Sequence, residues 1–363
     1  MDEPTCYPRF WQPNRLMSLP TPTTQTHSTP VRACCLCEGT DFEIINTKDR
    51  RGSSLVTVMC QHCGLISHRD IPTDEQLEQF YKSDYRLEYH GQRDPVPRRV
   101  MRAWKNGQRI LRQLEPHITR DARLLEIGAG LGCTVRNFQN AGYDIAGIDP
   151  SEDYTEFSTT QLIANMSKQS LADLDGTEPR DAILLVHVIE HLNAPHHAML
   201  KLHRLLKPGG QLYIECPNLD APVARRSQLF HYAHVYSFTP ATLRMLAERC
   251  GFELVRQFGH KKQANLQMLF RRTEVRSFHI REHSSQRTLQ RIRMSRLRYH
   301  LRPKYLIERV RKLTSYGIEH LFAERFVSRL IAECRNNRKV PVETQRFENP
   351  QPEPETAPLQ RVA

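Results

Sequence analysis

The sequence predicts an α/β protein with a seven-stranded, mostly parallel sheet and helices on both faces. The central observation is an apolar run, Leu124–Ile127, that enters a turn with glycine at every second position. A helix-like stretch follows, then a second apolar run over 145–148 that ends in Asp149. Further apolar runs alternate with helical segments across 181–270. Strands that alternate with helices usually lie parallel, because each helix returns the chain to the same edge of the sheet.

The glycine-rich turn and the acid after it predict a nucleotide site. Glycine permits a positive φ and lets a ligand approach the backbone closely. The carboxylate of Asp149, at the tip of the second strand, is placed to accept hydrogen bonds from a ribose. The pattern is not the dinucleotide fingerprint G-x-G-x-x-G, since it reads Glu-x-Gly-x-Gly-x-Gly from Glu126. A carboxylate there repels a pyrophosphate and suits a cationic ligand.

At these residues the chain resembles the class I S-adenosylmethionine (SAM)-dependent methyltransferases, over about residues 96–273. The resemblance implies a Rossmann-like fold in which the glycine-rich turn packs against the amino-acid part of SAM and the acid holds its ribose. The cofactor-binding residues that it implies are Glu126, Gly128, Ala129, Gly130, Gly132, Asp149, Pro150, Asp173 and His187. The alternative is a glycine-rich turn in some other α/β protein.

The remaining strands are predicted in the order that this fold requires. Residues 181–186 form a nearly continuous apolar run, as a strand buried on both faces should, and the run ends in a polar cluster. The segments 211–218, 252–255 and 265–270 predict three further strands. Between them, residues 243–252 predict a helix that closes at a glycine.

Two C-x-x-C pairs upstream predict a metal site. Cys34 and Cys37 form the first pair, Cys60 and Cys63 the second, with 22 residues between the pairs. Two such pairs on a hairpin make a zinc ribbon, in which four thiolates hold one tetrahedral Zn²⁺. The zinc is expected to be structural, because four protein ligands leave no open position. Disulfides are the alternative, and Cys35 is expected to be a bystander.

Composition, the motifs and the resemblance together divide the chain into six segments. They are a disordered tail (1–32), the zinc ribbon (33–68), a linker or substrate-cover segment (69–95), the SAM-dependent methyltransferase domain (96–273), a basic amphipathic helical appendage (274–339) and a second disordered tail (340–363). In zinc-ribbon methyltransferases of small molecules and sugars, which this arrangement resembles, a Tyr-rich linker lies over the substrate pocket. The alternative is that Tyr81, Tyr85 and Tyr89 only pack the joint between domains.

The positive charge belongs almost wholly to the appendage. Residues 271–339 hold 19 Lys and Arg against six Glu, whereas the whole chain carries a net charge of +12. Phe322, Phe326 and Leu330 lie at helical spacing and predict amphipathic helices. Three explanations compete: packing on the core with a solvated basic face, adsorption to an anionic membrane surface, and contact with RNA. No apolar run is long enough for a membrane span, so we expect a cytoplasmic protein, with peripheral contact at the inner membrane face as one alternative.

Methyl transfer from a sulfonium needs alignment and, for a hydroxyl or carbon acid, a base. We predict His191 as the base with Glu190 as its orienting partner or a substrate ligand, and place His187 toward the cofactor or the reaction centre. The alternative is that Glu190 and His191 cap the next helix. His234 and Tyr236, in a second His-rich stretch, are further candidates.

The sequence thus predicts a SAM-dependent methyltransferase with a structural Zn²⁺, acting on oxygen or carbon of a small molecule, most simply a sugar or glycan precursor. An RNA methyltransferase that holds RNA through its ribbon and Arg-rich tail is the first alternative. A catalytically idle adaptor is the second.

Overall fold

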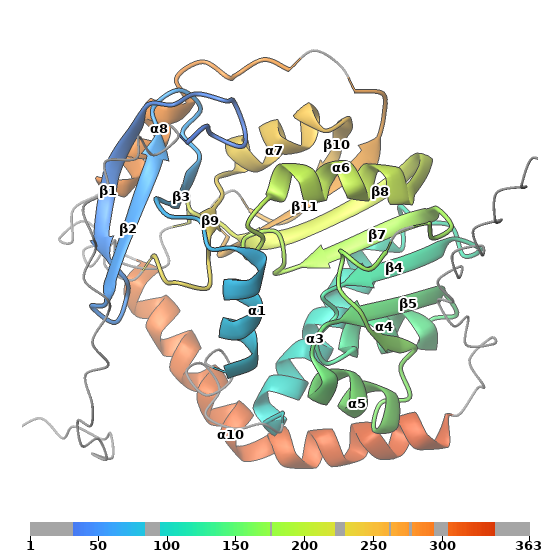
Figure 1. Ribbon diagram of the computed structural model, residues 1–363. Coiled ribbons are helices and arrows are strands. Elements are labelled where there is room, and N and C mark those ends of the chain that lie inside the picture. The colour runs from blue at the N-terminus through green and yellow to red at the C-terminus, as the bar shows by residue number, and fades with distance from the viewer. Residues whose placement is uncertain are drawn as a thin grey trace, which may run out of the picture. The chain divides into compact units, whose positions relative to one another are not determined.

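The computed structural model describes residues 32–83, 95–174, 176–221, 229–260, 263–275, 278–293 and 304–337 (Figure 1). The predicted disordered tails lie outside these residues, apart from Arg32, and so do Tyr85 and Tyr89 of the linker. All the elements below belong to one unit, Ala33–Ala363.

The larger sheet has seven strands in the order β10-β11-β8-β7-β4-β5-β6. Neighbouring strands are parallel except that β11 runs antiparallel to both β8 and β10. The strands are β4 (Arg123–Ile127), β5 (Asp144–Asp149), β6 (Met166–Lys168), β7 (Arg180–Val186), β8 (Leu206–Pro217), β10 (Phe252–Gln257) and β11 (Asn265–Arg272). The predicted fold class is therefore confirmed.

Helices cover both faces of this sheet (Figure 1). One face packs against α6 (Pro195–Leu205) and α7 (Pro240–Arg249), and the other against α3 (Pro97–Leu114), α4 (Cys133–Asn140) and α5 (Glu152–Thr160). Alternate residues of one strand serve the two faces: Leu185 belongs to the first apolar cluster and Leu184 to the second. Burial on both sides explains why these strands are continuously apolar.

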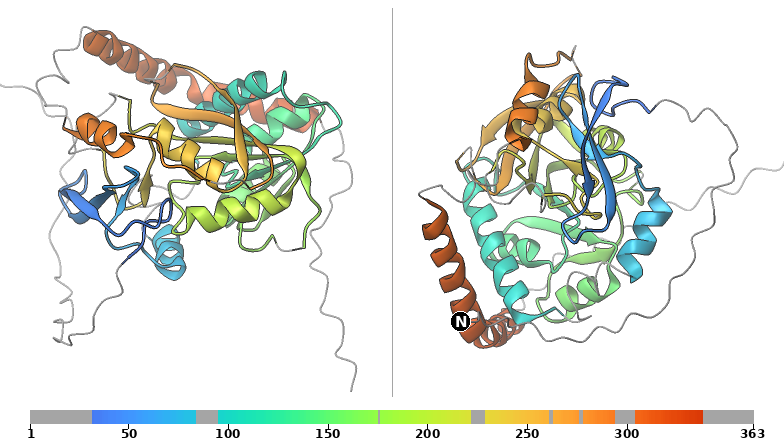
Figure 2. Two further views of the ribbon diagram at one scale, coloured as in Figure 1. Left: turned by 90° about the horizontal axis from the view of Figure 1, so that it is seen from above. Right: turned by 90° about the vertical axis from the view of Figure 1, so that its left-hand side faces the viewer.

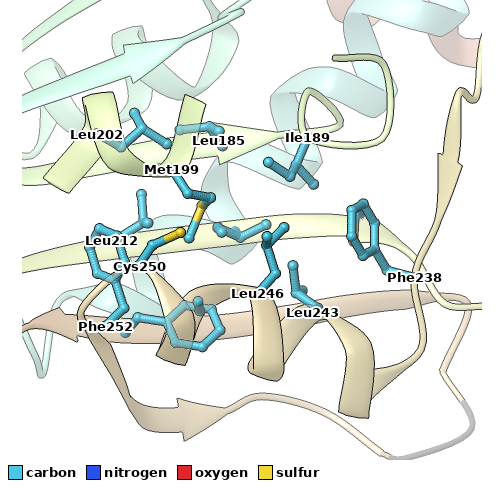
Figure 3. Packing of buried hydrophobic residues seen from close by; sticks show 14 of the residues in the cluster. Leu185, Ile189, Met199, Leu202, Leu212, Phe238, Leu243, Leu246, Cys250 and Phe252 are labelled. Carbon is cyan, nitrogen blue, oxygen red and sulfur yellow. The ribbon is translucent and has the colours of Figure 1, made fainter. Parts of the chain in front are cut away.

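Figure 3 shows the packing on the first face. Met199 of α6 and Leu246 of α7 meet the side chains of Leu185 and Leu212 from the sheet, and all four are fully buried. Phe238, just before α7, lies in the same cluster. Burial of each such side chain contributes about 1.5–3 kcal/mol to folding, so this layer fixes the loops that leave its strands.

A second, antiparallel sheet contains the ribbon segment. Its order is β1-β2-β3-β9, and its strands are β1 (Phe42–Lys48), β2 (Ser54–Cys60), β3 (Ile66–His68) and β9 (Tyr236–Ser237). The fourth strand comes from the larger domain, between α6 and α7: Ile66 pairs with Ser237 and Ser67 with Tyr236. The ribbon and the larger domain therefore share one sheet, which the sequence did not indicate.

Two further helices pack on the ribbon side of the molecule. In the linker, α1 (Asp74–Ser83) places Phe80 edge-on against Tyr232, with ring centroids 4.9 Å apart. From the appendage, α8 (Ser284–Ile292) approaches the second cysteine pair so closely that a Cβ on Gly64 would lie 2.8 Å from the Cα of Ser285. Part of the basic appendage is thus packed on the ribbon.

The long C-terminal helix α10 (Lys304–Asn336) lies beside α3 (Figures 1 and 2). Ala323, Val327 and Leu330 are buried, whereas Phe322 is 52% exposed. The buried stripe of α10 therefore includes Leu330, as predicted, together with Ala323 and Val327, but it does not include Phe322. No described helix has the length and apolar content needed to cross a membrane.

A buried guanidinium holds the end of α10. Arg136 of α4 is 4% exposed and donates to the carbonyl oxygens of Ile163 (3.1 Å), Cys334 (3.3 Å) and Asn337 (3.0 Å). The last carbonyls of a helix lack partners within it and carry partial negative charge. Arg136 therefore ties the C-terminus of α10 to the helix that follows the glycine-rich turn.

We expect Arg136→Gln to lower the free energy of unfolding by about 2–4 kcal/mol, because hydrogen bonds from a buried charged donor are lost. The matched control is Arg335→Gln, which removes an exposed guanidinium bonded to Gln161 at the same helix end and should cost less than about 1 kcal/mol. Denaturant unfolding measures both. Equal effects would show that Arg136 does not anchor the helix.

Candidate functional site

The glycine-rich turn joins β4 to α4, and its three glycines have positive φ: 68° at Gly128, 53° at Gly130 and 65° at Gly132. A Cβ on Gly128 would lie 2.5 Å from Val188 Cγ2, and one on Gly132 would lie 2.7 Å from Ser158 Cβ. A Cβ on Gly130 would meet nothing within 4 Å. Gly128 and Gly132 are thus required by packing as well as by φ, whereas Gly130 borders open space.

The carboxylate of Asp149 fixes this turn. Its two oxygens accept hydrogen bonds from the backbone N–H groups of Gly130 (2.8 Å) and Ser151 (2.9 Å). In addition, the N–H of Ala129 donates to the carbonyl of Ile148 at 2.9 Å. The end of β5 and the turn after β4 therefore form one rigid edge, and Pro150 and Ser151 lead from it into α5.

Two other predicted cofactor residues, Glu126 and Asp173, have their carboxyl groups engaged by neighbouring groups of the protein. Glu126 is 2% exposed, and burial raises its pKa to about 8, against the opposing effect of hydrogen bonds with Thr134 and Val135 in the first turn of α4. Its carboxyl group thus contacts the start of α4 inside the protein. Asp173 is exposed beyond β6 and accepts from the backbone N–H (2.7 Å) and hydroxyl (2.8 Å) of Ser170, which lower its pKa.

His187 follows β7 directly and has a φ of 57°, a left-handed conformation that costs a non-glycine residue about 1 kcal/mol or more. Its Nδ1 lies 3.0 Å from Glu190 Oε1, and its Nε2 lies 3.2 Å from Asn265 Nδ2. Because an amide nitrogen only donates, Nε2 accepts and Nδ1–H donates to the carboxylate. Burial lowers the pKa of His187, but the hydrogen bond and charge of Glu190 outweigh it, so the pKa is raised.

A buried polar network holds Asn265 in place. Glu215 of β8 is 1% exposed and accepts from Asn265 Nδ2 at 2.8 Å and from the Tyr213 hydroxyl at 2.9 Å. It also forms an ion pair with Arg109 of α3. The sequence analysis missed Arg109, Glu215 and Asn265. The available signal was polar residues inside strongly apolar strands, since such groups are retained only with partners.

His191, the predicted base, is more enclosed than His187: its side chain is 14% exposed, against 40% for His187. Its Nδ1 lies 2.7 Å from the carbonyl oxygen of Ala233, and its Nε2 lies 3.7 Å from Glu190 Oε1. The ring meets His234 edge-on, with centroids 4.9 Å apart. Burial lowers the pKa of both histidines.

The other predictions for this region have clear outcomes. Glu190 and His191 do not cap the next helix, because the N-cap of α6 is Ala194 and no side chain bonds there. Tyr236 is buried, and its hydroxyl donates to the carbonyl of Asn193 at 3.2 Å. Its hydroxyl is therefore engaged beside the joint with the ribbon, and a catalytic role for Tyr236 stays a prediction.

The four predicted ligand cysteines converge. Cys34 Sγ lies 3.6 Å from Cys63 Sγ, and Cys37 Sγ lies 3.5 Å from Cys60 Sγ. Two thiolates on one tetrahedral Zn²⁺ are about 3.8 Å apart, whereas disulfide sulfurs are about 2.05 Å apart. The described cysteines, Cys35 among them, are all unbridged. The donor set and its spacing fit zinc.

Comparison with known proteins agrees with the fold. Residues 96–257 match the family described as a methyltransferase domain. A ubiquinone biosynthesis O-methyltransferase of Alkalilimnicola ehrlichii is 29% identical over 105 residues, which are 26% of this chain and 42% of that protein. One from Caulobacter vibrioides is 30% identical over 104 residues, 26% of this chain and 40% of that protein. The chain thus spans less than half the length of these relatives.

Solved structures with a similar fold include a 1,6-didemethyltoxoflavin-N1-methyltransferase of Burkholderia thailandensis (TM-score 0.44, 20% identity, 58% of this chain and 96% of that one). Another is the magnesium protoporphyrin IX methyltransferase of Synechocystis (TM-score 0.42, 17% identity, 54% of this chain and 100% of that one). The family match over residues 96–257 and the seven-stranded sheet together support a methyltransferase domain with a Rossmann-like fold in this part of the chain.

The raised pKa of Glu126 has a consequence for stability. Because its folded-state pKa of about 8 exceeds the ordinary 4.5, the folded state binds more protons between these values, and the free energy of unfolding falls as pH rises through this window. We expect Glu126→Gln to remove this loss, so that its stability relative to wild type increases toward pH 9, by at most about 5 kcal/mol.

Thermal unfolding between pH 5 and pH 9 measures the effect. The control is Glu253→Gln, which removes an exposed carboxylate on β10 and should follow wild type at every pH. Parallel profiles for wild type and Glu126→Gln would show that Glu126 is not protonated in the folded protein.

Proposed function

We propose that the protein is a SAM-dependent methyltransferase that methylates a hydroxyl oxygen of a small molecule. The observation that carries the proposal is the position of the His187–Glu190 pair. Val188, which follows His187 directly in the chain, packs on Gly128, the first glycine of the turn: a Cβ on Gly128 would lie 2.5 Å from Val188 Cγ2. The candidate base and the predicted cofactor turn are therefore neighbours at the same edge of the sheet.

The cofactor would occupy the turn and the end of β5. Asp149 already orients the N–H groups around it, so its carboxylate is held in one position for a ribose diol. Gly130 borders open space, which lets a ligand approach its backbone. SAM supplies the electrophilic methyl group, and its sulfur departs as a neutral thioether.

His187 replaces His191 as our proposed base. As the acceptor oxygen attacks the methyl group, its proton passes to His187 Nε2. In the structure, that nitrogen accepts a hydrogen bond from the side-chain amide of Asn265. Glu190 holds Nδ1–H and stabilises the imidazolium that forms. His191 is a poorer candidate, because its Nδ1 is engaged by Ala233 and its ring is more enclosed.

The hydroxyl acceptor rests on two kinds of support. The relatives from ubiquinone biosynthesis are named as O-methyltransferases, which favours a hydroxyl. The ribbon followed by the short helix α1 favours a sugar or glycan precursor among hydroxyl compounds. In either kind of acceptor the hydroxyl would lose its proton to His187.

The test is transfer of label from methyl-tritiated SAM to a lysate of a host lacking the gene. We expect label in small molecules, insensitive to ribonuclease, and at least tenfold weaker SAM binding by Asp149→Asn, since two anchoring hydrogen bonds and the ribose ligand are impaired. Asp144→Asn, at the exposed start of the same strand, is the control. His187→Ala should bind SAM normally and lose transfer.

Ribonuclease-sensitive label would replace this proposal with the RNA methyltransferase alternative. Normal SAM binding by Asp149→Asn would contradict the cofactor site. Normal methyl transfer by His187→Ala would contradict the role of His187 as the base, but it would leave the proposed activity and the cofactor site in place.

The four cysteines would hold a structural Zn²⁺ as part of the same proposal. The zinc would join the two cysteine turns, which lie in the first apolar cluster with α7. We expect Cys60→Ser to lose one equivalent of zinc per chain and to unfold at lower temperature, because structural zinc contributes directly to folding. Metal analysis and thermal unfolding measure both effects, with Cys250→Ser as the control for a buried cysteine outside the cluster. Unchanged zinc content in Cys60→Ser would contradict the site.

A further inference from the structure

A second group of potential metal ligands lies at the end of β7, away from the cysteines. Among the described residues, Glu190, His191 and His234 each place one ligand atom so that the three atoms lie within 4.8 Å of one another. His191 Nε2 and Glu190 Oε1 are 3.7 Å apart. Two ligands of one tetrahedral Zn²⁺ are about 3.3 Å apart, so these atoms would have to approach one another by up to about 1.5 Å to bind one ion.

The hydrogen bonds around His191 fix its tautomer. The carbonyl oxygen of Ala233 only accepts, so Nδ1 of His191 carries the proton and Nε2 carries the lone pair. That lone pair lies on the side of Glu190 and His234. A histidine ligand typically donates its other N–H to a carbonyl or carboxylate in this way, which orients the ring toward the metal.

One carboxylate oxygen of Glu190 is available to bind a metal ion. Its side chain is 1% exposed, and Oε2 has no hydrogen-bond partner among the described residues. Oε1 accepts a hydrogen bond from His187 Nδ1–H, 3.0 Å away. A buried carboxylate oxygen without a partner is costly. A cation beside Glu190 would remove that cost.

We propose that Glu190, His191 and His234 bind a divalent metal ion, with Zn²⁺ as the best fit. Two imidazoles and one carboxylate are a donor set that zinc prefers. Three protein ligands leave a further position open, unlike the four cysteines. The ion joins the end of β7 to the segment that precedes β9, so His234 has a role although it is distant from His187 in the chain.

The open position gives the site a chemical use. An acceptor hydroxyl bound to the ion would have a lowered pKa and would lose its proton to His187 more readily. This use rests on the proposed function, whereas binding of the ion does not. The two can therefore fail separately.

Cobalt distinguishes the two metal sites. We expect purified protein to hold two metal equivalents, and mild chelation to remove the one with the open position. Titration with Co²⁺ should then restore one equivalent with weak visible bands and no thiolate-to-cobalt charge-transfer band. His234→Asn and Glu190→Gln should weaken this binding by at least about 100-fold. The matched control is His231→Asn, which should bind normally; the His231 ring lies tilted against His234, with centroids 3.8 Å apart.

His234→Cys guards against a variant that merely misfolds. It should keep the ion and add a thiolate-to-cobalt band, which only direct ligation can produce. A single metal equivalent in wild type, or Co²⁺ binding that neither His234→Asn nor Glu190→Gln weakens, would overturn the site. Two metal equivalents in a protein that transfers no methyl group would support the metal site and contradict the proposed function. Methyl transfer by a protein that holds one metal equivalent would support the proposed function and contradict the metal site.

Discussion

The pairing of β9 with β3 is the constraint on which the candidate site depends. The short segment around β9 bonds on one side to the ribbon, where the N–H of His68 donates to the carbonyl of Val235 at 2.9 Å. On the other side, the N–H of Tyr236 donates to the carbonyl of Glu190 at 3.1 Å, and the carbonyl oxygen of Ala233 accepts a hydrogen bond from His191 Nδ1. One extended segment thus fixes both the ribbon and the end of β7.

This arrangement gives the ribbon a part in the site without supplying a reacting group. The cysteine turns share an apolar cluster with α7, and Arg249 of α7 donates to the carbonyl oxygen of Leu36 at 2.7 Å. If the four thiolates bind one Zn²⁺ as proposed, the ribbon would be rigid, and the strand that pairs with it would be held in place as well. The position of His234 beside Glu190 follows from that rigidity.

Glu190 is the side chain that the site shares most widely. Its Oε1 lies 3.0 Å from His187 and 3.7 Å from His191. Burying a carboxylate so deeply is costly unless nearby groups compensate it. The Nδ1–H of His187, 3.0 Å from Oε1, is one such group, and the proposed ion would be another. The proposed base and the proposed metal site are therefore coupled through one residue.

Much of the fold followed from local pattern. The glycine spacing, Asp149 and the apolar strands predicted the parallel sheet and the turn, because glycine φ angles and strand burial depend on nearby sequence. The C-x-x-C pairs predicted a four-cysteine cluster, since the reach of each short turn is fixed. These features were set by the sequence alone.

Other features were decided only by contacts between distant residues. No local signal says that Tyr236 pairs with Ser67, that Glu126 is buried against α4, or that Asn265 holds Nε2 of His187. The choice between His187 and His191 depended on which ring kept its exposure, and the facing of α10 depended on the surface of α3. Sequence gave the residue types and their local order, but burial and long-range pairing determined which of them act together.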